Sequence, residues 1–167
     1  MQPKPKTGKL ITLAAATLFL TSSFLHAQGA VSLTCVGYKE VTTVGEDGNQ
    51  TVKRIPAAKV LPGEEVIYTI TYEHTGKNEP AETVVITNPT PDDTVYIDGS
   101  AKGEGTEITF SVDNGKTYAK PDDLTVTAED GTKRPARASD YTHVRWTKLE
   151  DLKKGEKGTV EFGVKVK

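Results

Sequence analysis

The chain has 167 residues, with 21 lysines and arginines against 23 aspartates and glutamates, and 35% of its residues are hydrophobic. This charge balance lacks the excess of cations that nucleic acids and anionic lipid surfaces attract, so neither is expected as a partner. Beyond the first 30 residues no segment is apolar enough to cross a bilayer.

Residues 1–27 have the pattern of a secretory signal peptide. Three lysines precede the apolar run LITLAAATLFLTSSFL, and the small residue Ala27 follows it. We expect cleavage after Ala27, with Ala30 as the fallback position. The alternative is an uncleaved membrane anchor, for which the run is short and rich in Ser and Thr.

Cleavage at this position would define the mature chain and its compartment. Three lysines and no acidic residue leave with the peptide, so 18 basic residues remain against 23 acidic ones, a net charge of −5. We expect an exported protein, periplasmic or secreted, with no membrane span after cleavage. The remaining 140 residues suit one domain with one core.

Cys35 is the only cysteine, so no disulfide can form within the chain. It alternates with Val31 and Leu33, which predicts the inner face of a first strand. The alternative is a free thiol that pairs with another chain. Residues 28–57 as a whole are predicted to form an N-terminal strand or hairpin extension of the domain, with Asp47-Gly48 as a turn.

Residues 58–167 show short runs of alternating apolar residues, which are typical of half-buried strands. The first run has Val66, Tyr68, Ile70 and Tyr72 on one face, and residues 160–166 repeat the pattern at the end. Residues 83–87 are predicted as a strand covered on both faces. Further strands are expected around Phe110, with Ser111 facing outward, and from Tyr141 to Thr147.

Turn residues separate these runs, and no long stretch has the spacing of an amphipathic helix. Asn114-Gly115 and Asp130-Gly131 accept the positive φ that tight turns require, and Pro62-Gly63 marks another turn. The prediction is therefore an all-β domain, a sandwich of two antiparallel sheets. Its predicted core contains Tyr68, Ile70, Phe110, Trp146 and Phe162.

Four stretches carry a resemblance to a known family: a Pro-Gly turn before a Y-T-I-T strand, a strand ending in N-P, a later R-W, and a Gly-rich turn before the last strand. In order they are VLPGEEVIYTITYEHTGKNEPAETVVITNPTP, YIDGSA, FSVDNGKTY and YTHVRWTKLEDLKKGEKGTVEFGVKV. Residues 58–167 thus resemble the bacterial "conserved repeat domain" family, domain of unknown function eleven. The resemblance implies an immunoglobulin-like β-sandwich of two antiparallel sheets, exported to the envelope or beyond. Family members commonly occur as tandem modules, whereas this chain has a single copy, and the family has no catalytic residues to carry over.

No arrangement of residues predicts catalysis. His74, in a polar turn, and His143, on the outer side of a strand, are expected at the surface, without a nucleophile beside them. No enzyme activity, cofactor or dedicated metal site is therefore predicted. The acidic middle of the chain supplies calcium candidates, Asp92, Asp93 and Asp113, although the spacing of a calcium loop is absent and Asp113 also fits a plain turn.

Two surface groups are candidates for recognition. Tyr141, His143 and Arg145 alternate on one strand and form either a ligand-facing stripe or an ordinary solvated sheet face. Glu161 and Lys165 face outward from the last strand, which either pairs with another chain along its edge or carries charges that prevent such pairing.

The sequence therefore predicts a non-catalytic, exported structural or interaction module of the bacterial cell envelope. Its partner would be another envelope or secreted protein, recognised through a sheet edge or face. The alternative is a calcium-assisted β-sandwich that binds a small ligand or a glycan.

Overall fold

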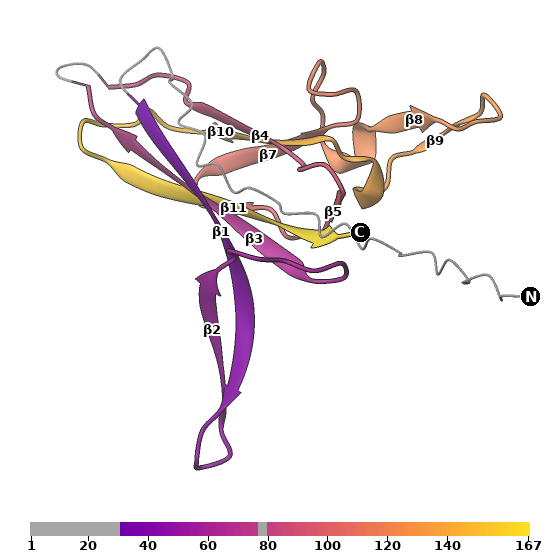
Figure 1. Ribbon diagram of the computed structural model, residues 1–167. Coiled ribbons are helices and arrows are strands. Elements are labelled where there is room, and N and C mark those ends of the chain that lie inside the picture. Colours follow the sequence, from indigo (N-terminus) through magenta and orange to yellow (C-terminus); the bar gives the residue numbers. More distant parts are fainter. Residues whose placement is uncertain (1–30, 77–79) are drawn as a thin grey trace, which may run out of the picture.

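The computed structural model describes residues 31–76 and 80–167 and consists almost entirely of β-strands (Figure 1). The predicted signal peptide lies outside the described residues. The strands are β1 (Val31–Val44), β2 (Gln50–Pro56), β3 (Glu65–His74), β4 (Val85–Pro89), β5 (Thr94–Tyr96), β6 (Lys102–Gly103), β7 (Thr106–Ser111), β8 (Thr125–Thr127), β9 (Lys133–Pro135), β10 (His143–Lys148) and β11 (Lys157–Val166). Two single 3₁₀ turns, Pro121–Asp123 and Ala138–Asp140, are the helical elements of the described part.

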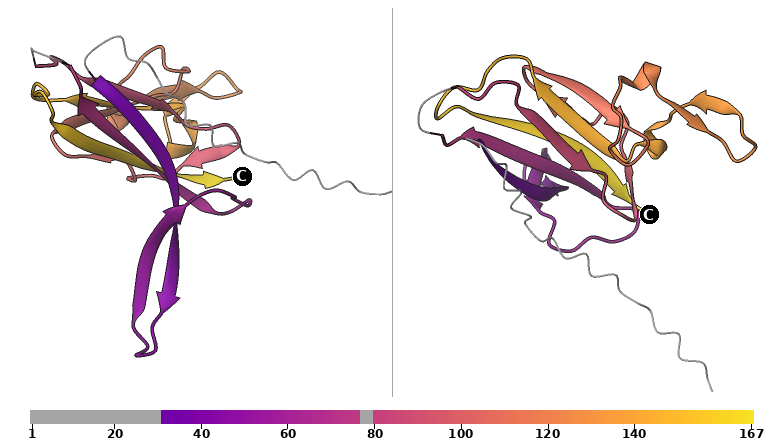
Figure 2. Two further views of the ribbon diagram at one scale, coloured as in Figure 1. Left: turned by 60° about the vertical axis from the view of Figure 1, so that its left-hand side comes forward. Right: turned by 90° about the horizontal axis from the view of Figure 1, so that it is seen from above.

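The strands form two antiparallel sheets that pack face to face, and this confirms the predicted all-β sandwich (Figure 2). The first sheet has the order β2-β1-β3-β11-β5, with β6 also paired to β11. The second has the order β4-β10-β7. β8 and β9 form a separate two-stranded ribbon beside the sandwich.

Strict alternation places β3 and β11 in the first sheet with one face on the core. In β3 the side chains of Val66, Tyr68, Ile70 and Tyr72 are buried, as the sequence pattern predicts. The partner residues in β11 follow the same rule, because Val160 lies opposite Ile70 and Phe162 opposite Tyr68. A side chain that is fully buried in this way contributes about 1.5–3 kcal/mol relative to an exposed one.

Aromatic rings fill the space between the sheets. Phe162 stacks on Tyr68 at 5.3 Å between ring centroids and lies 5.9 Å from Trp146 of the second sheet. Trp146 is fully buried. All five residues predicted for the core are buried, and Ile70 and Phe110 are the other two.

Gly103 lets the Trp146 indole approach the backbone of β6. A Cβ atom at this glycine would lie 2.9 Å from Trp146 Cδ1 and 2.8 Å from Val160 Cγ1. The indole Nε1 is buried and has no hydrogen-bond partner among the described residues. Packing alone therefore orients this ring.

β4 differs from the prediction for residues 83–87. The strand begins at Val85, two residues later, because Thr83 adopts a positive φ of 51°. Val85 is 46% exposed, so only one face of the strand is covered. β4 pairs with β10 alone and forms an edge of the second sheet.

β1 belongs both to the sandwich and to a hairpin that extends away from it. Its first part pairs with β3 from Val31 to Tyr38, and its second part pairs with β2 from Tyr38 to Val44. The two predicted alternatives for the N-terminal segment, strand and hairpin, therefore occur in one continuous strand. We call residues 39–56 the projecting hairpin (Figure 1).

Candidate functional site

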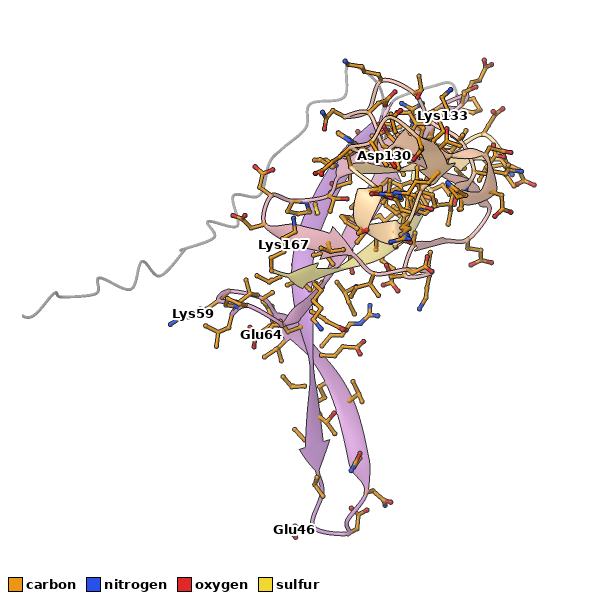
Figure 3. The ribbon with its side chains drawn as sticks, turned by 90° about the vertical axis from the view of Figure 1, so that its right-hand side faces the viewer. Glu46, Lys59, Glu64, Asp130, Lys133 and Lys167 are labelled. Atoms are coloured by element: carbon orange, nitrogen blue, oxygen red, sulfur yellow. The ribbon has the colours of Figure 1, made fainter. Side chains whose placement is uncertain are left out.

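The projecting hairpin extends away from the sandwich (Figure 1). Every residue of β2 is exposed, and the turn between the strands contains Gly48 at a φ of 76°. Figure 3 shows Glu46 at the tip, whereas Lys59 and Glu64 lie where the hairpin meets the sandwich. Since the hairpin adds little to the core, its exposed surface is a candidate for recognition.

The backbone of β2 presents a free edge to solvent. Ala57 donates its amide to the Gly37 carbonyl, and Gly45 donates to Asn49, so these two pairs at the ends of the β1–β2 register are hydrogen-bonded pairs. In an antiparallel ladder such pairs occur at every second residue. The odd-numbered residues of β2 therefore bond to β1, and Gln50, Val52 and Arg54 direct their amides and carbonyls outward.

The hairpin also exposes apolar side chains. Val52 is 57% exposed and Val44 67% exposed, and both project from the same face because even-numbered residues pair with one another across the ladder. Ile55, on the opposite face, is 41% exposed. A strand of another chain can pair with an exposed backbone edge of this kind, and the apolar side chains beside the edge can pack against that strand.

Ion pairs fix the base of the hairpin to the first sheet. Arg54 donates from Nη1 to Glu161 Oε2 at 2.7 Å and from Nε to Glu40 Oε1 at 3.2 Å. These bonds lower the pKa of Glu161 and raise that of Arg54. A second contact joins Lys39 Nζ to Glu64 Oε1 at 3.0 Å. The hairpin is therefore held in a defined direction.

β11 does not form the exposed edge that the sequence suggested. It pairs with β3 from Lys157 to Lys165 on one side, and with β5 and β6 on the other. The prediction was wrong because the last strand of a chain need not be the last strand of a sheet. Glu161 is engaged by Arg54, and Lys165 is exposed on the outer face.

The outer face of the second sheet carries two of the three predicted stripe residues. The Arg145 guanidinium lies 3.4 Å above the Tyr118 ring centroid, and its Nε donates to Thr87 Oγ1 at 3.3 Å. The His143 ring lies nearly perpendicular to the Tyr118 ring, with 6.5 Å between centroids. The pKa of His143 is lowered by partial burial and by the charge of Arg145. Tyr118 was not predicted, because it lies in a loop without a periodic pattern.

Tyr141 is not part of this face, contrary to the prediction. Its side chain is only 6% exposed and stacks on Phe110 with 4.4 Å between ring centroids. The alternation fails here because β10 begins at His143, and Tyr141 ends the 3₁₀ turn Ala138–Asp140. Tyr141 therefore belongs to the core.

The calcium candidates are not brought together into one site. Asp113 is occupied by its own turn, where it accepts hydrogen bonds from both the amide and the hydroxyl of Thr117 and from the Ser111 hydroxyl. These bonds hold the pKa of Asp113 well below its usual range. Asp92 and Asp93 lie in the loop before β5. Within residues 31–76 and 80–167, no three His, Cys, Asp or Glu side chains form a group that could hold a metal ion.

Ser111 is a buried polar residue, although the alternating sequence pattern predicted that it faces outward. It is fully buried, and its Oγ accepts hydrogen bonds from the amides of Asp113 and Gly115 at 3.2 and 2.9 Å. The strand ends at Ser111, and its side chain organises the turn that follows. The sequence signal was the pair Ser111 and Asp113 immediately before Asn114-Gly115.

His74 and Cys35 also have defined environments. His74 is 1% exposed at the end of β3, contrary to the expected surface position, and its Nδ1 accepts the Gly76 amide at 3.1 Å. Cys35 packs against the core with Val31 and Leu33, as predicted. Burial raises the pKa of its thiol, which lowers its reactivity.

Comparison with known proteins finds no matching family model, no matching characterised protein and no matching solved structure. Among the described residues, no helix is long and apolar enough to span a membrane.

Proposed function

We propose that this protein is a non-catalytic, exported structural or interaction module of the bacterial cell envelope. It recognises another envelope or secreted protein by strand pairing along the free edge of β2. The outward backbone groups of Val52 and Arg54 carry this proposal, because an unpaired edge supplies the hydrogen bonds that an added strand needs. The resemblance to the conserved repeat domain family, with an immunoglobulin-like sandwich, agrees with such a role.

The shape of the hairpin favours recognition over a purely structural role. A two-stranded ribbon in water is at best marginally stable, and β2 gains no buried side chain from the sandwich. Edge strands that only need protection are usually short or covered. Here the edge is extended outward and anchored in one direction by Arg54.

Lys53 and Pro56 are features that can also discourage pairing, but neither closes this edge. Pro56 lies at the base, at the end of β2. Lys53 directs its backbone groups toward β1, because it pairs with Val41 on the bonded side of the ladder. The edge between Gln50 and Arg54 stays available.

Crosslinked affinity capture from the native cell envelope and medium tests the edge. The substitution Val52→Pro removes one outward amide and leaves the β1 ladder intact, since proline is tolerated on the free side of an edge strand. We expect it to abolish capture of a partner that the unaltered protein retains in constant ratio. Val52→Thr, which keeps the amide and changes the side chain, is the matched control. Equal capture by both variants, or an empty capture from both fractions, would contradict the proposal.

Export has its own test, independent of any partner. The mass of the mature protein recovered from the periplasm or the medium should correspond to a chain that begins at Gln28, or at Val31 if the fallback site is used. A full-length chain retained in the membrane fraction would support the uncleaved anchor instead.

A further inference from the structure

A cluster of three aromatic rings joins β5, β7 and the segment before β10. Tyr96 of β5 meets Phe110 of β7 edge-on at 5.2 Å between centroids, and Tyr141 stacks on Phe110 at 4.4 Å. Each of these side chains is at most 6% exposed. The three rings are therefore held in place by packing, and the surface beside them has a defined shape.

A groove of about 260 Å³ opens beside this cluster. The three rings line it together with the apolar side chains of Ile108 and Pro121. Asp98 is the charged residue of its lining, and no described lysine or arginine lines it. Pockets for drug-sized ligands measure about 300–1,000 Å³, so this groove suits a smaller molecule.

The two tyrosine hydroxyls at the groove differ in their partners. Tyr96 Oη accepts the Ala101 amide at 3.0 Å. No described residue hydrogen-bonds to the hydroxyl of Tyr141, whereas its backbone carbonyl accepts a bond from Thr90 Oγ1 at 3.0 Å. Its Oη is therefore an available acceptor beside the groove.

The electrostatic surroundings of Tyr141 are negative. Burial raises the pKa of Tyr141, and the charges of Asp98, Asp122 and Asp140 raise it further. Asp140 is compensated by Arg134, whose Nη1 and Nη2 donate to it at 2.7 and 2.9 Å. Asp98 and Asp122 have no ion-pair partner within residues 31–76 and 80–167, so they are free to compensate a bound cation.

We propose that this groove binds a small alkylammonium ion. The alkyl chain lies against the aromatic and aliphatic walls, and the ammonium group donates to Tyr141 Oη near the carboxylate of Asp98. An ammonium group has three donors and no acceptor, which matches an unpartnered oxygen and a carboxylate. This proposal concerns a different surface from the β2 edge and does not depend on the proposed function.

Titration of the ¹⁵N-labelled mature chain with n-butylammonium, followed by NMR, tests the groove. We expect saturable shifts at residues 96–101 and 141, with a dissociation constant in the millimolar range. Neutral n-butanol and anionic butyrate, which have the same alkyl chain, should give no saturable shifts there. Binding should weaken as the salt concentration rises, because the carboxylate is at the surface.

Two substitutions and one control separate the groups involved. Tyr141→Phe keeps the ring packing and removes the acceptor, and we expect about five-fold weaker binding with an unchanged melting temperature. Asp98→Asn should weaken binding about three-fold. Asp123→Asn removes the same charge from an exposed neighbour that does not act on Tyr141, and it should leave binding unchanged.

Several results would overturn the proposal. One is equal binding of butanol and butylammonium, because the charge would then contribute nothing. Another is an Asp98→Asn variant that binds no more weakly than Asp123→Asn. A lysine-containing peptide that binds much more tightly than the free amine would also overturn it, by assigning the groove to a protein partner.

Discussion

Arg54 of the projecting hairpin and Glu161 of β11 form an ion pair between residues 107 positions apart, with 2.7 Å between Nη1 and Oε2. Lys102 Nζ lies 3.7 Å from the other oxygen of the same carboxylate. The pair joins a hairpin that is exposed on both faces to a strand in the interior of the first sheet. It therefore sets the direction of the hairpin more than it stabilises the core.

Arg54→Gln should loosen the hairpin without unfolding the sandwich. A partly exposed ion pair is worth at most about 1 kcal/mol, so the melting temperature should change little, whereas amide exchange at Thr51, Lys53 and Ile55, which bond to β1, should become faster. Lys53→Gln removes the same charge from the opposite face of β2 and serves as the control. Equal exchange rates in the two variants would show that Arg54 does not anchor the hairpin.

The same pair predicts a pH dependence of hairpin anchoring. Arg54 lowers the pKa of Glu161 in the folded protein below its unfolded value. The anchoring contribution is therefore complete above the ordinary glutamate pKa and is lost as the pH falls through the lowered value. Amide exchange at β2, corrected for its intrinsic pH dependence, should accelerate only in the acid range, and Glu161→Gln should remove this dependence.

Ser111→Ala should lower the free energy of unfolding by about 1–2 kcal/mol. The substitution leaves the amides of Asp113 and Gly115 without their acceptor in a partly buried turn. Ser139→Ala, at an exposed serine of a 3₁₀ turn, is the control and should be neutral. Urea unfolding measures both. A neutral Ser111→Ala would mean that the turn does not depend on this hydroxyl.

His143 should titrate below the ordinary histidine pKa. Partial burial and the Arg145 charge lower its pKa, and Asp113 opposes this in part. Because the unfolded chain binds the proton more readily, stability should fall as the pH decreases through the unfolded value of about 6.5. NMR titration should show the His143 pKa rising in Arg145→Gln and unchanged in Lys165→Gln, which removes a charge on the other sheet.

Gly103→Ala should destabilise the protein by about 1–3 kcal/mol. Its Cβ would lie 2.6 Å from Thr106 Oγ1 and 2.9 Å from Trp146 Cδ1, so the core around the indole has to shift. Gly163→Ala is a milder comparison, because its Cβ would lie 3.2 Å from Ser100 Cβ. The alanine also lowers the conformational entropy of the unfolded chain, which offsets part of the destabilisation. Equal stabilities of the two variants would contradict this reading of the β6 contact.

The sequence predicts β3 and β11 well because each has one face on the core. In a strand of this kind the period of two is set by burial, so Tyr68 and Phe162 can be placed on the inner face without knowledge of their partners. Trp146 follows for the same reason, since it shares the apolar face of β10 with Val144.

The errors occur at strand ends, where alternation no longer applies. Tyr141 precedes β10 and enters the core from a 3₁₀ turn, and Ser111 ends β7 and turns inward to bond with the loop. His74 is buried at the end of β3 although its sequence neighbours are polar. Local pattern fixes the face of a residue only inside a strand.

The order of strands in a sheet is the other property that local patterns do not contain. β11 ends the described chain yet lies between β3 and β5, while β2, with little apolar character, takes the edge. The groove beside Tyr141 was likewise not predictable, because Asp98, Phe110 and Tyr141 come from separate segments that only the tertiary fold brings together.

The fourteen residues of β1 also give the molecule a mechanical property. A pull on the tip of the hairpin travels along one continuous backbone into the sandwich. There it is opposed by the ladder from Val31–His74 to Tyr38–Ile67, whose hydrogen bonds lie across the direction of tension. Bonds loaded in this shear geometry share the force and have to break together. The hairpin is thus attached in a geometry that resists its detachment from the sandwich under load.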